Sequence, residues 1–181
     1  MTSADELLWH VDVQDVPLGA RTRADIHALR LLHRSVHMLV SDPDGNILLQ
    51  LRSGTKDENP GLWDTSAAGH VDYGESYDDS ARRELGEELG IHVAVEALHF
   101  LFRMEALPEF GSEFVQVYQV VWNGPLQLSE AEISEVRWFT PEQLDHAVAM
   151  DNPAYTGTFK RLWRIYRSSS LVAIPSSNSA K

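Results

Sequence analysis

The chain has 181 residues, which is enough for one domain with a sizeable core and too few to expect two. It contains no cysteine, so disulfides, thiolate metal sites and cysteine nucleophiles are excluded. A formal net charge of −12 argues against general nucleic-acid binding, but not against a small phosphorylated substrate held through cations. The N-terminus lacks signal-peptide features and no apolar run could span a bilayer, so we expect a cytoplasmic protein without membrane contact.

The N-terminal part of the chain is expected to contain one strand and a polar connection. Residues 1–6 are interpreted as a flexible leader. Residues 7–13 are apolar and β-branched enough to predict a strand. Pro17 and Gly19 then predict a turn, because both residue types favour turn conformations. Residues 21–32 are predicted to be a polar segment that leads the chain toward the interior of the domain.

A β-hairpin is predicted next. Residues 34–41 and 47–51 are strand-like, and the sequence DPDGN over residues 42–46 between them is a strong turn signal. Residues 52–61 then predict a polar loop before a short run over residues 62–65, and residues 66–68 are expected to lead into Gly69 as the end of a strand.

The second half of the chain alternates between strand-like and helix-like segments. Thr140, Pro141 and Gln143 have the spacing of a capped helix start, which predicts a helix at that point. The expected elements are strands over residues 98–104, 114–122 and 135–139, helices over residues 141–149 and 155–167, and a disordered serine-rich tail over residues 168–181.

The stretch between Gly69 and Ile91, GHVDYGESYDDSARRELGEELGI, predicts a loop followed by a helix. Ser76 can cap the N-terminus of this helix, and Gly90 can end it in the left-handed conformation. Leu85 and Leu89, spaced i and i+4, can anchor one face of the helix to a core.

Three carboxylates share another face of this helix, because Glu84, Glu87 and Glu88 are spaced i, i+3 and i+4. Like charges at this spacing repel by a few tenths of a kcal/mol per pair, so folding alone does not favour the arrangement. A hard divalent cation, Mg²⁺ or Mn²⁺, would remove the repulsion, since both prefer oxygen ligands. The alternative interpretation is a solvated acidic face without a ligand.

The full spacing is Gly69-x5-Glu75-x7-Arg83-Glu84-Leu85-x-Glu87-Glu88-x-Gly90-Ile91, and it resembles the signature of the Nudix hydrolase family at every defining position. The resemblance implies a single α/β/α sandwich domain over residues 7–167, with the motif helix against a mixed β-sheet. It also implies metal-dependent hydrolysis of a diphosphate linkage in a nucleoside diphosphate joined to another group, by attack of water on phosphorus.

The resemblance further implies roles for individual residues. Glu84, Glu87 and Glu88 correspond to metal ligands, and the last two are candidates to orient or deprotonate the attacking water. Arg83 is expected to hold one of these carboxylates in position. The remaining expectations are structural roles for Glu75 and Gly90, and metal coordination by the backbone carbonyl of Ala68 or Gly69.

Residues outside the motif supply candidate substrate contacts. Arg52 and Trp63 could contact substrate, although an aromatic residue at position 63 is equally compatible with the core. The acidic candidates are Glu113, at the start of a predicted strand, and the group Glu130, Glu132 and Glu135. Each acid also fits an ordinary surface position.

Several segments also resemble isopentenyl-diphosphate isomerases, a branch of the same superfamily: His33, WDTSAAGH over residues 63–70, Glu113, and residues 135–138. Those isomerases carry a cysteine immediately before the Gly-His pair, where this chain has Ala68. They also gather histidines and two acids around a metal, and Gly111 occupies the place of one of these acids. We therefore expect a hydrolase from an isomerase-like subgroup, with His33 and His70 as structural residues.

Other possibilities stay open at the level of sequence. A non-catalytic Nudix module that senses a nucleotide is one alternative, although such modules usually have degraded glutamates. A homodimer is a candidate assembly. The helix over residues 155–167 has an apolar stripe and basic flanks, which indicate core packing more strongly than contact with a membrane or an acidic partner. Substrate identity is not determined by the motif.

Overall fold

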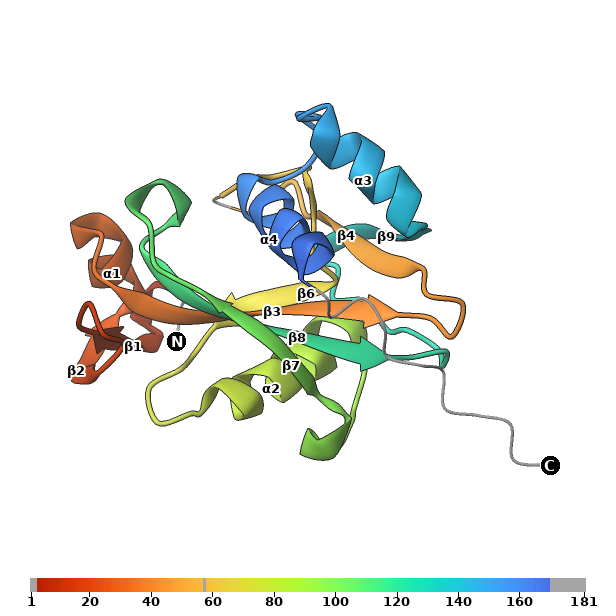
Figure 1. The fold of residues 1–181 in the computed structure, drawn as a ribbon. Helices are drawn as coiled ribbons and strands as arrows, with labels where there is room; N and C mark the ends of the chain where they lie inside the picture. The colour runs from red at the N-terminus through yellow and green to blue at the C-terminus, as the bar shows by residue number, and fades with distance from the viewer. Residues whose placement is uncertain (1–2, 57, 170–181) are drawn as a thin grey trace.

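The computed structural model describes residues 3–56 and 58–169, and within these ranges it forms a nine-stranded mixed β-sheet with helices on both faces (Figure 1). The α-helices are α1 (Arg23–Leu29), α2 (Tyr77–Leu89), α3 (Pro141–Ala149) and α4 (Gly157–Ser168), with short 3₁₀ helices at Ser3–Asp5, Val95–Ala97 and Pro108–Phe110. The strands are β1 (Leu7–Val11), β2 (Pro17–Thr22), β3 (His33–Ser41), β4 (Ile47–Arg52), β5 (Trp63–Asp64), β6 (Ala67–His70), β7 (His99–Met104), β8 (Glu113–Val121) and β9 (Ile133–Phe139).

Strand β3 is the centre of the sheet. Along one side it pairs in parallel with β8, from His33 opposite Glu113 to Ser41 opposite Val121. Along the other side it pairs antiparallel with β1, β6 and β4 in succession. Strand β4 then pairs with β9 and β5, while β7 pairs with β8. The short strand β6 therefore lies beside β3 with its other edge free of strand pairing in the described chain.

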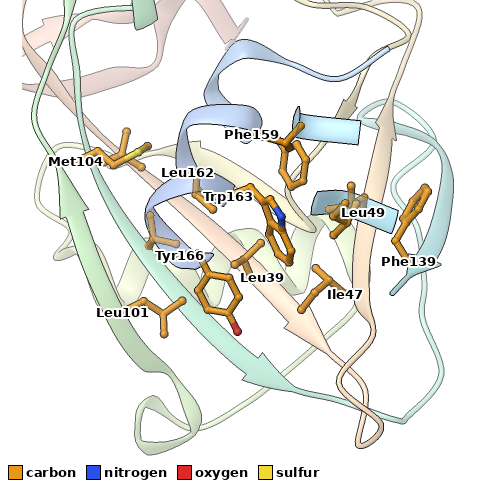
Figure 2. Packing of buried hydrophobic residues seen from close by; sticks show 14 residues of the cluster. Leu39, Ile47, Leu49, Leu101, Met104, Phe139, Phe159, Leu162, Trp163 and Tyr166 are labelled. Atoms are coloured by element: carbon orange, nitrogen blue, oxygen red, sulfur yellow. The ribbon is translucent and has the colours of Figure 1, made fainter. Parts of the chain in front are cut away.

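Alternate residues of the central strands supply two cores, one on each face of the sheet. Leu39 and Leu49 face α3 and α4, where Phe159, Leu162 and Trp163 of α4 are almost completely buried (Figure 2). On the opposite face, the core includes residues of β3, β8 and α2: Val36, Met38, Val40, Tyr118, Val120, Ala81, Leu85 and Leu89. The prediction of an α/β/α sandwich is confirmed.

The N-terminal region differs from expectation. Pro17 and Gly19 lie in strand β2 rather than in a turn, and the polar segment that follows contains helix α1. The turn instead comes earlier, because the Asp12 side chain accepts hydrogen bonds from the backbone of Gln14 and Val16, at 2.8 and 2.9 Å. This side chain ends the first strand at Val11, before the predicted end at residue 13.

Helix α1 was missed because it is short and its signals are weak. Its only buried residue is Ile26, so it shows no apolar periodicity, and it ends at Arg30 in the left-handed conformation without a glycine. Within the described residues, no helix has both the length and the apolar character needed to cross a membrane.

The predicted helix boundaries in the rest of the chain are close to the observed ones. The Ser76 hydroxyl caps α2, and Gly90 ends it with a φ of 69°. Thr140 and Gln143 form the expected capping box of α3. Helix α4 starts two positions later than predicted, because Thr156 caps it through the backbone N–H of Phe159. The tail expected from residue 168 lies almost entirely outside the described residues.

Candidate functional site

Helix α2 places its acidic face against the free edge of β6. Ala81, Leu85 and Leu89 are fully buried in the core below the sheet, which fixes the rotation of the helix. The remaining face turns Glu84 and Glu88 toward a cleft of about 1100 Å³. The motif carboxylates therefore line a cleft through which a ligand could approach this helix.

Glu88 is the most deeply buried of these acids, with 5% of its surface exposed. Its Oε2 atom accepts hydrogen bonds from Gln50 Nε2 at 2.9 Å and from the Ala68 backbone N–H at 3.3 Å. Burial and the neighbouring carboxylate of Glu84 raise the pKa of Glu88 well above its ordinary value, and these two hydrogen bonds only partly oppose the shift. A nearby cation would favour the ionised form.

Glu84 lies directly against the backbone of β6. Gly69 has no side chain, and a Cβ atom at that position would overlap the Glu84 carboxylate. Burial raises the pKa of Glu84 to about 7, although Arg83 Nη1 donates a hydrogen bond of 2.7 Å to its Oε1 atom and opposes the shift. Glu87 differs from the other two acids, because 61% of its side chain is exposed.

Arg83 links the loop that precedes α2 to the helix through hydrogen bonds of its side chain. Its guanidinium donates to both carboxylate oxygens of Glu75, to Glu84, and to the backbone carbonyl of His70. Burial alone would raise the pKa of Glu75, yet the bonds from Arg83 and Ser80 outweigh it and hold this pKa below its ordinary value. The positive charge of Arg83 is therefore shared among several acids and leaves Glu88 without a cationic partner in the described chain.

The geometry of β6 determines which backbone groups face these acids. In an antiparallel pair, alternate residues turn both their N–H and their C=O outward. The Ala68 N–H bonds Glu88 and the His70 carbonyl accepts from Arg83, so both residues present their backbone groups to α2. The Ala68 carbonyl shares this outward edge, whereas the polar backbone groups of Gly69 turn toward β3.

This arrangement fits a hard divalent cation. Two largely buried carboxylates, one exposed carboxylate and an outward carbonyl form an all-oxygen donor set, which suits Mg²⁺ or Mn²⁺. Burial raises the pKa of both Glu84 and Glu88, and Glu88 has no cationic partner in the described chain. The space that Gly69 leaves for the Glu84 carboxylate is a further feature that folding alone does not require.

The predicted substrate contacts fall into two groups. Arg52, Glu113 and Glu132 line the cleft, and Arg52 is also held by the Glu58 carbonyl through hydrogen bonds of 3.1 and 3.0 Å. Trp63 and Glu135 do not line the cleft. Trp63 packs edge-on against Phe139 in the core, and Glu135 is an exposed residue of β9 bonded to Arg137. Glu130 also lies outside the cleft lining.

The two histidines expected to be structural residues, His33 and His70, lie together with a third. The ring centroids of His27, His33 and His70 lie 5.1 to 5.8 Å apart, and nitrogen atoms of all three lie within 4.8 Å of one another. Glu113 Oε1 lies 3.4 Å from His33 Nε2 and 3.5 Å from His70 Nε2. Burial alone would raise the pKa of Glu113, but the two histidines hold it well below its ordinary value.

Sequence reasoning missed several residues of the site. Gln50 is a buried amide inside an otherwise apolar strand, and His37 is a buried histidine in the next strand along the sheet. A polar residue at an apolar position of a predicted strand is the signal that could have identified both. His27 lies on the short helix α1, which sequence reasoning missed because the helix has no apolar periodicity, so His27 was missed as well.

Comparison with known proteins agrees with this geometry. The family model of the NUDIX domain matches residues 31–162, which is well over half of the chain. An uncharacterised Nudix hydrolase of Pseudomonas aeruginosa is 41% identical over 138 residues, covering 76% of this chain and 80% of the relative. The chain belongs to the Nudix family.

Two further similarities span most of the chain. An isopentenyl-diphosphate Delta-isomerase of Photorhabdus laumondii is 33% identical over 162 residues, covering 87% of this chain and 90% of the relative. A crystal structure of a protein from Deinococcus radiodurans superposes with a TM-score of 0.73 at 29% identity, covering 88% of this chain and 98% of that one. Relatives of both the hydrolase and the isomerase kinds are therefore similar to this protein.

Proposed function

We propose that this protein is a metal-dependent hydrolase that cleaves a diphosphate linkage in a nucleoside diphosphate joined to another group. The observation that carries the proposal is that Glu84, Glu87 and Glu88 all line the cleft, with Glu88 bonded to the outward edge of β6. Membership of the Nudix family supports hydrolase activity. We place the catalytic unit in residues 7–167 and its action in the cytoplasm.

The carboxylates of Glu84, Glu87 and Glu88, together with the Ala68 carbonyl, would hold Mg²⁺ or Mn²⁺. When bound, such an ion neutralises charge on phosphate oxygens and lowers the pKa of a coordinated water. Gly69 keeps the space that the Glu84 carboxylate occupies, and Gln50 orients the Glu88 carboxylate toward the cleft.

The other residues of the site position the acids or the substrate. Glu87 and Glu88 are the candidates to orient the attacking water and accept its proton. Arg83 holds Glu84 in place through its 2.7 Å hydrogen bond. Positive charge near the path of an anionic substrate comes from four other residues that line the cleft: Arg23, Arg30, Arg52 and Lys56.

The test is a hydrolysis screen over diphosphate-linked nucleotides with and without Mg²⁺. Wild-type protein is compared with Glu87→Gln and Glu88→Gln, which remove one charge while keeping the side-chain shape. We expect metal-dependent release of phosphate-containing products that falls by at least about 100-fold in Glu88→Gln. Metal-independent turnover, or turnover that survives both substitutions, would contradict the proposal. Tight nucleotide binding without turnover would instead indicate a sensing module.

A second candidate function is isomerisation of isopentenyl diphosphate. The cluster of His27, His33, His70 and Glu113 favours it, because isomerases of this superfamily gather histidines and acids around a metal. The similarity to the Photorhabdus laumondii isomerase is consistent with this alternative. Ala68 argues against it, since the chain has no thiol to act as the second acid/base group. An isomerisation assay run beside the hydrolysis screen distinguishes the two functions.

A homodimer stays a prediction. Measurement of the molar mass in solution by light scattering, with and without Mg²⁺, tests it directly.

A further inference from the structure

His37 is a buried histidine of the cleft to which the proposed hydrolysis gives no role. It lies on β3 with 6% of its surface exposed, and it is one of the residues that line the cleft. Its Nδ1 atom lies 2.8 Å from Thr65 Oγ1. No hydrogen bond to its Nε2 atom is found in the part of the chain that the structure describes.

The hydrogen bonds of the neighbouring threonine bear on the tautomer of His37. Thr65 Oγ1 lies 3.3 Å from the Ala67 carbonyl oxygen and can donate its single proton there. With the proton placed there, Oγ1 accepts from His37, which assigns the proton of the neutral ring to Nδ1. In a neutral imidazole with a protonated Nδ1, the Nε2 atom has a free lone pair. Burial also lowers the pKa of His37, which keeps the ring neutral.

The position of the ring places this lone pair next to the candidate diphosphate site. His37 is the cross-strand partner of Ala68, and the outward direction of the Ala68 N–H shows that this pair is of the closer, non-hydrogen-bonded kind. Both residues line the cleft, and Ala68 carries only a methyl group there. A group attached to a diphosphate held by α2 would therefore share this cleft with His37.

Charges of both signs surround His37. Burial has the largest effect and lowers the pKa of the ring, the carboxylates of Asp64 and Glu113 raise it, and the Arg52 guanidinium lowers it. The acids nearest to His37 are already occupied: Asp64 accepts from Thr156 and Thr65, and Glu113 accepts from Ser35. A hydroxyl is the uncharged donor that diphosphate-linked groups most commonly carry.

We propose that His37 is a specificity-determining residue whose Nε2 atom accepts a hydrogen bond from a hydroxyl on the group attached to the diphosphate. This inference rests on the proposed diphosphate function and extends it, because it assigns the site to sugar-like rather than hydrocarbon groups. A buried acceptor left without a donor is unfavourable, so substrates that lack the hydroxyl are disfavoured.

Two substitutions separate this role from a structural one. In His37→Asn, the amide nitrogen occupies the place of Nδ1 and can still donate to Thr65, while nothing replaces Nε2. In His37→Gln, the amide extends to the place of Nε2 and can supply an acceptor there. His146→Gln, which changes an exposed histidine of α3 outside the cleft, is the matched control.

The experiment uses the full chain with Mg²⁺ and two probes that cannot be hydrolysed: methylene-bridged ADP-ribose, which carries hydroxyls, and methylenediphosphonate, which does not. Titration calorimetry gives the affinities, and ¹⁵N NMR of the histidine rings reports on Nε2 of His37. We expect His37→Asn to weaken the ADP-ribose analogue about tenfold, His37→Gln to restore most of this, and methylenediphosphonate affinity to stay unchanged. The Nε2 resonance of His37 should move only with the hydroxylated probe.

Other outcomes overturn the inference in distinguishable ways. If the hydroxylated probe binds and shifts the Ala68 amide, but neither the Nε2 resonance nor the affinity of His37→Asn changes, the role of His37 is wrong while the diphosphate site stands. Binding of methylenediphosphonate alone also contradicts the role of His37. If neither probe binds in the presence of Mg²⁺, the proposed function fails, and the inference fails with it.

Discussion

Gln50 and Glu88 are 38 residues apart in the chain, yet Gln50 Nε2 donates a hydrogen bond of 2.9 Å to Glu88 Oε2 in the interior. This contact joins β4 to the C-terminal turn of α2. Because an amide donor lowers the pKa of a buried carboxylate, Gln50 favours the ionised form of Glu88. The orientation and charge of a candidate metal ligand thus depend on a neighbouring strand.

Substitution Gln50→Leu should weaken metal binding. Glu88 would keep only the Ala68 N–H, and loss of a group that orients a metal ligand typically costs about tenfold or more in affinity. The measurement is the Mg²⁺ concentration at half-maximal activity, or Mn²⁺ binding by calorimetry. Gln119→Leu is the control, because Gln119 is a buried amide bonded to Ser41 at 3.0 Å, away from the cleft. Equal Mg²⁺ requirements in the two variants would contradict the role of Gln50.

Gly69→Ala should impair the reaction without unfolding the protein. The new Cβ would overlap the Glu84 carboxylate and force that side chain to move. Displacement of a reacting group by about 1 Å can reduce activity by about 100-fold, so we expect a loss of this order in kcat/KM. Gly54→Ala is the matched control, since a Cβ there meets no atom within 4 Å. Full activity in Gly69→Ala would show that Glu84 can move without consequence.

Arg83→Lys should destabilise the protein even though it keeps the charge. A lysine ammonium cannot bond Glu75, Glu84 and the His70 carbonyl simultaneously, as the forked guanidinium does. We expect the free energy of unfolding to fall by about 2 kcal/mol in urea denaturation with EDTA present. Arg82→Lys is the comparison, because Arg82 is an exposed residue that bonds only the Val93 carbonyl, at 3.0 Å, among its described contacts. Similar losses in both variants would indicate a general effect of lysine on α2.

The metal-free protein should lose stability as the pH rises from about 4.5 to about 7, partly because of Glu84. Its pKa is about 7 in the folded chain against an ordinary value of 4.5, so the folded state holds the proton that the unfolded state releases over this range. In EDTA, Glu84→Gln should remove part of this decline, by at most about 3 kcal/mol. Thermal unfolding of both proteins at several pH values provides the measurement.

Glu87→Gln serves as the control for this pH dependence. It removes a carboxylate from the same helix, but 61% of the Glu87 side chain is exposed, so no comparable burial is relieved. If wild-type protein and Glu84→Gln show the same pH dependence in EDTA, the Glu84 carboxylate is not protonated near neutral pH in the folded chain.

Much of the fold followed from local signals in the sequence. The residues between Asp42 and Asn46 form the predicted turn, because the Asp42 side chain accepts from the backbone of Asp44 and Asn46. Ser76 and Gly90 delimit α2 as predicted, because capping and left-handed termination depend on single residue types at single positions. Where such signals are weak the prediction failed, as for β2 and α1, whose residues gain their structure by pairing with β1 and burying Ile26.

The sequence by itself also determined the acidic face of α2, because helical periodicity alone aligns Glu84, Glu87 and Glu88. Only the tertiary structure decided their environments. It buries Glu88 beside Gln50, leaves Glu87 exposed, and brings His27, His33 and His70 to one point from three separate elements. Contacts of this kind depend on the pairing of distant strands and on burial, neither of which is set by residue spacing within one segment.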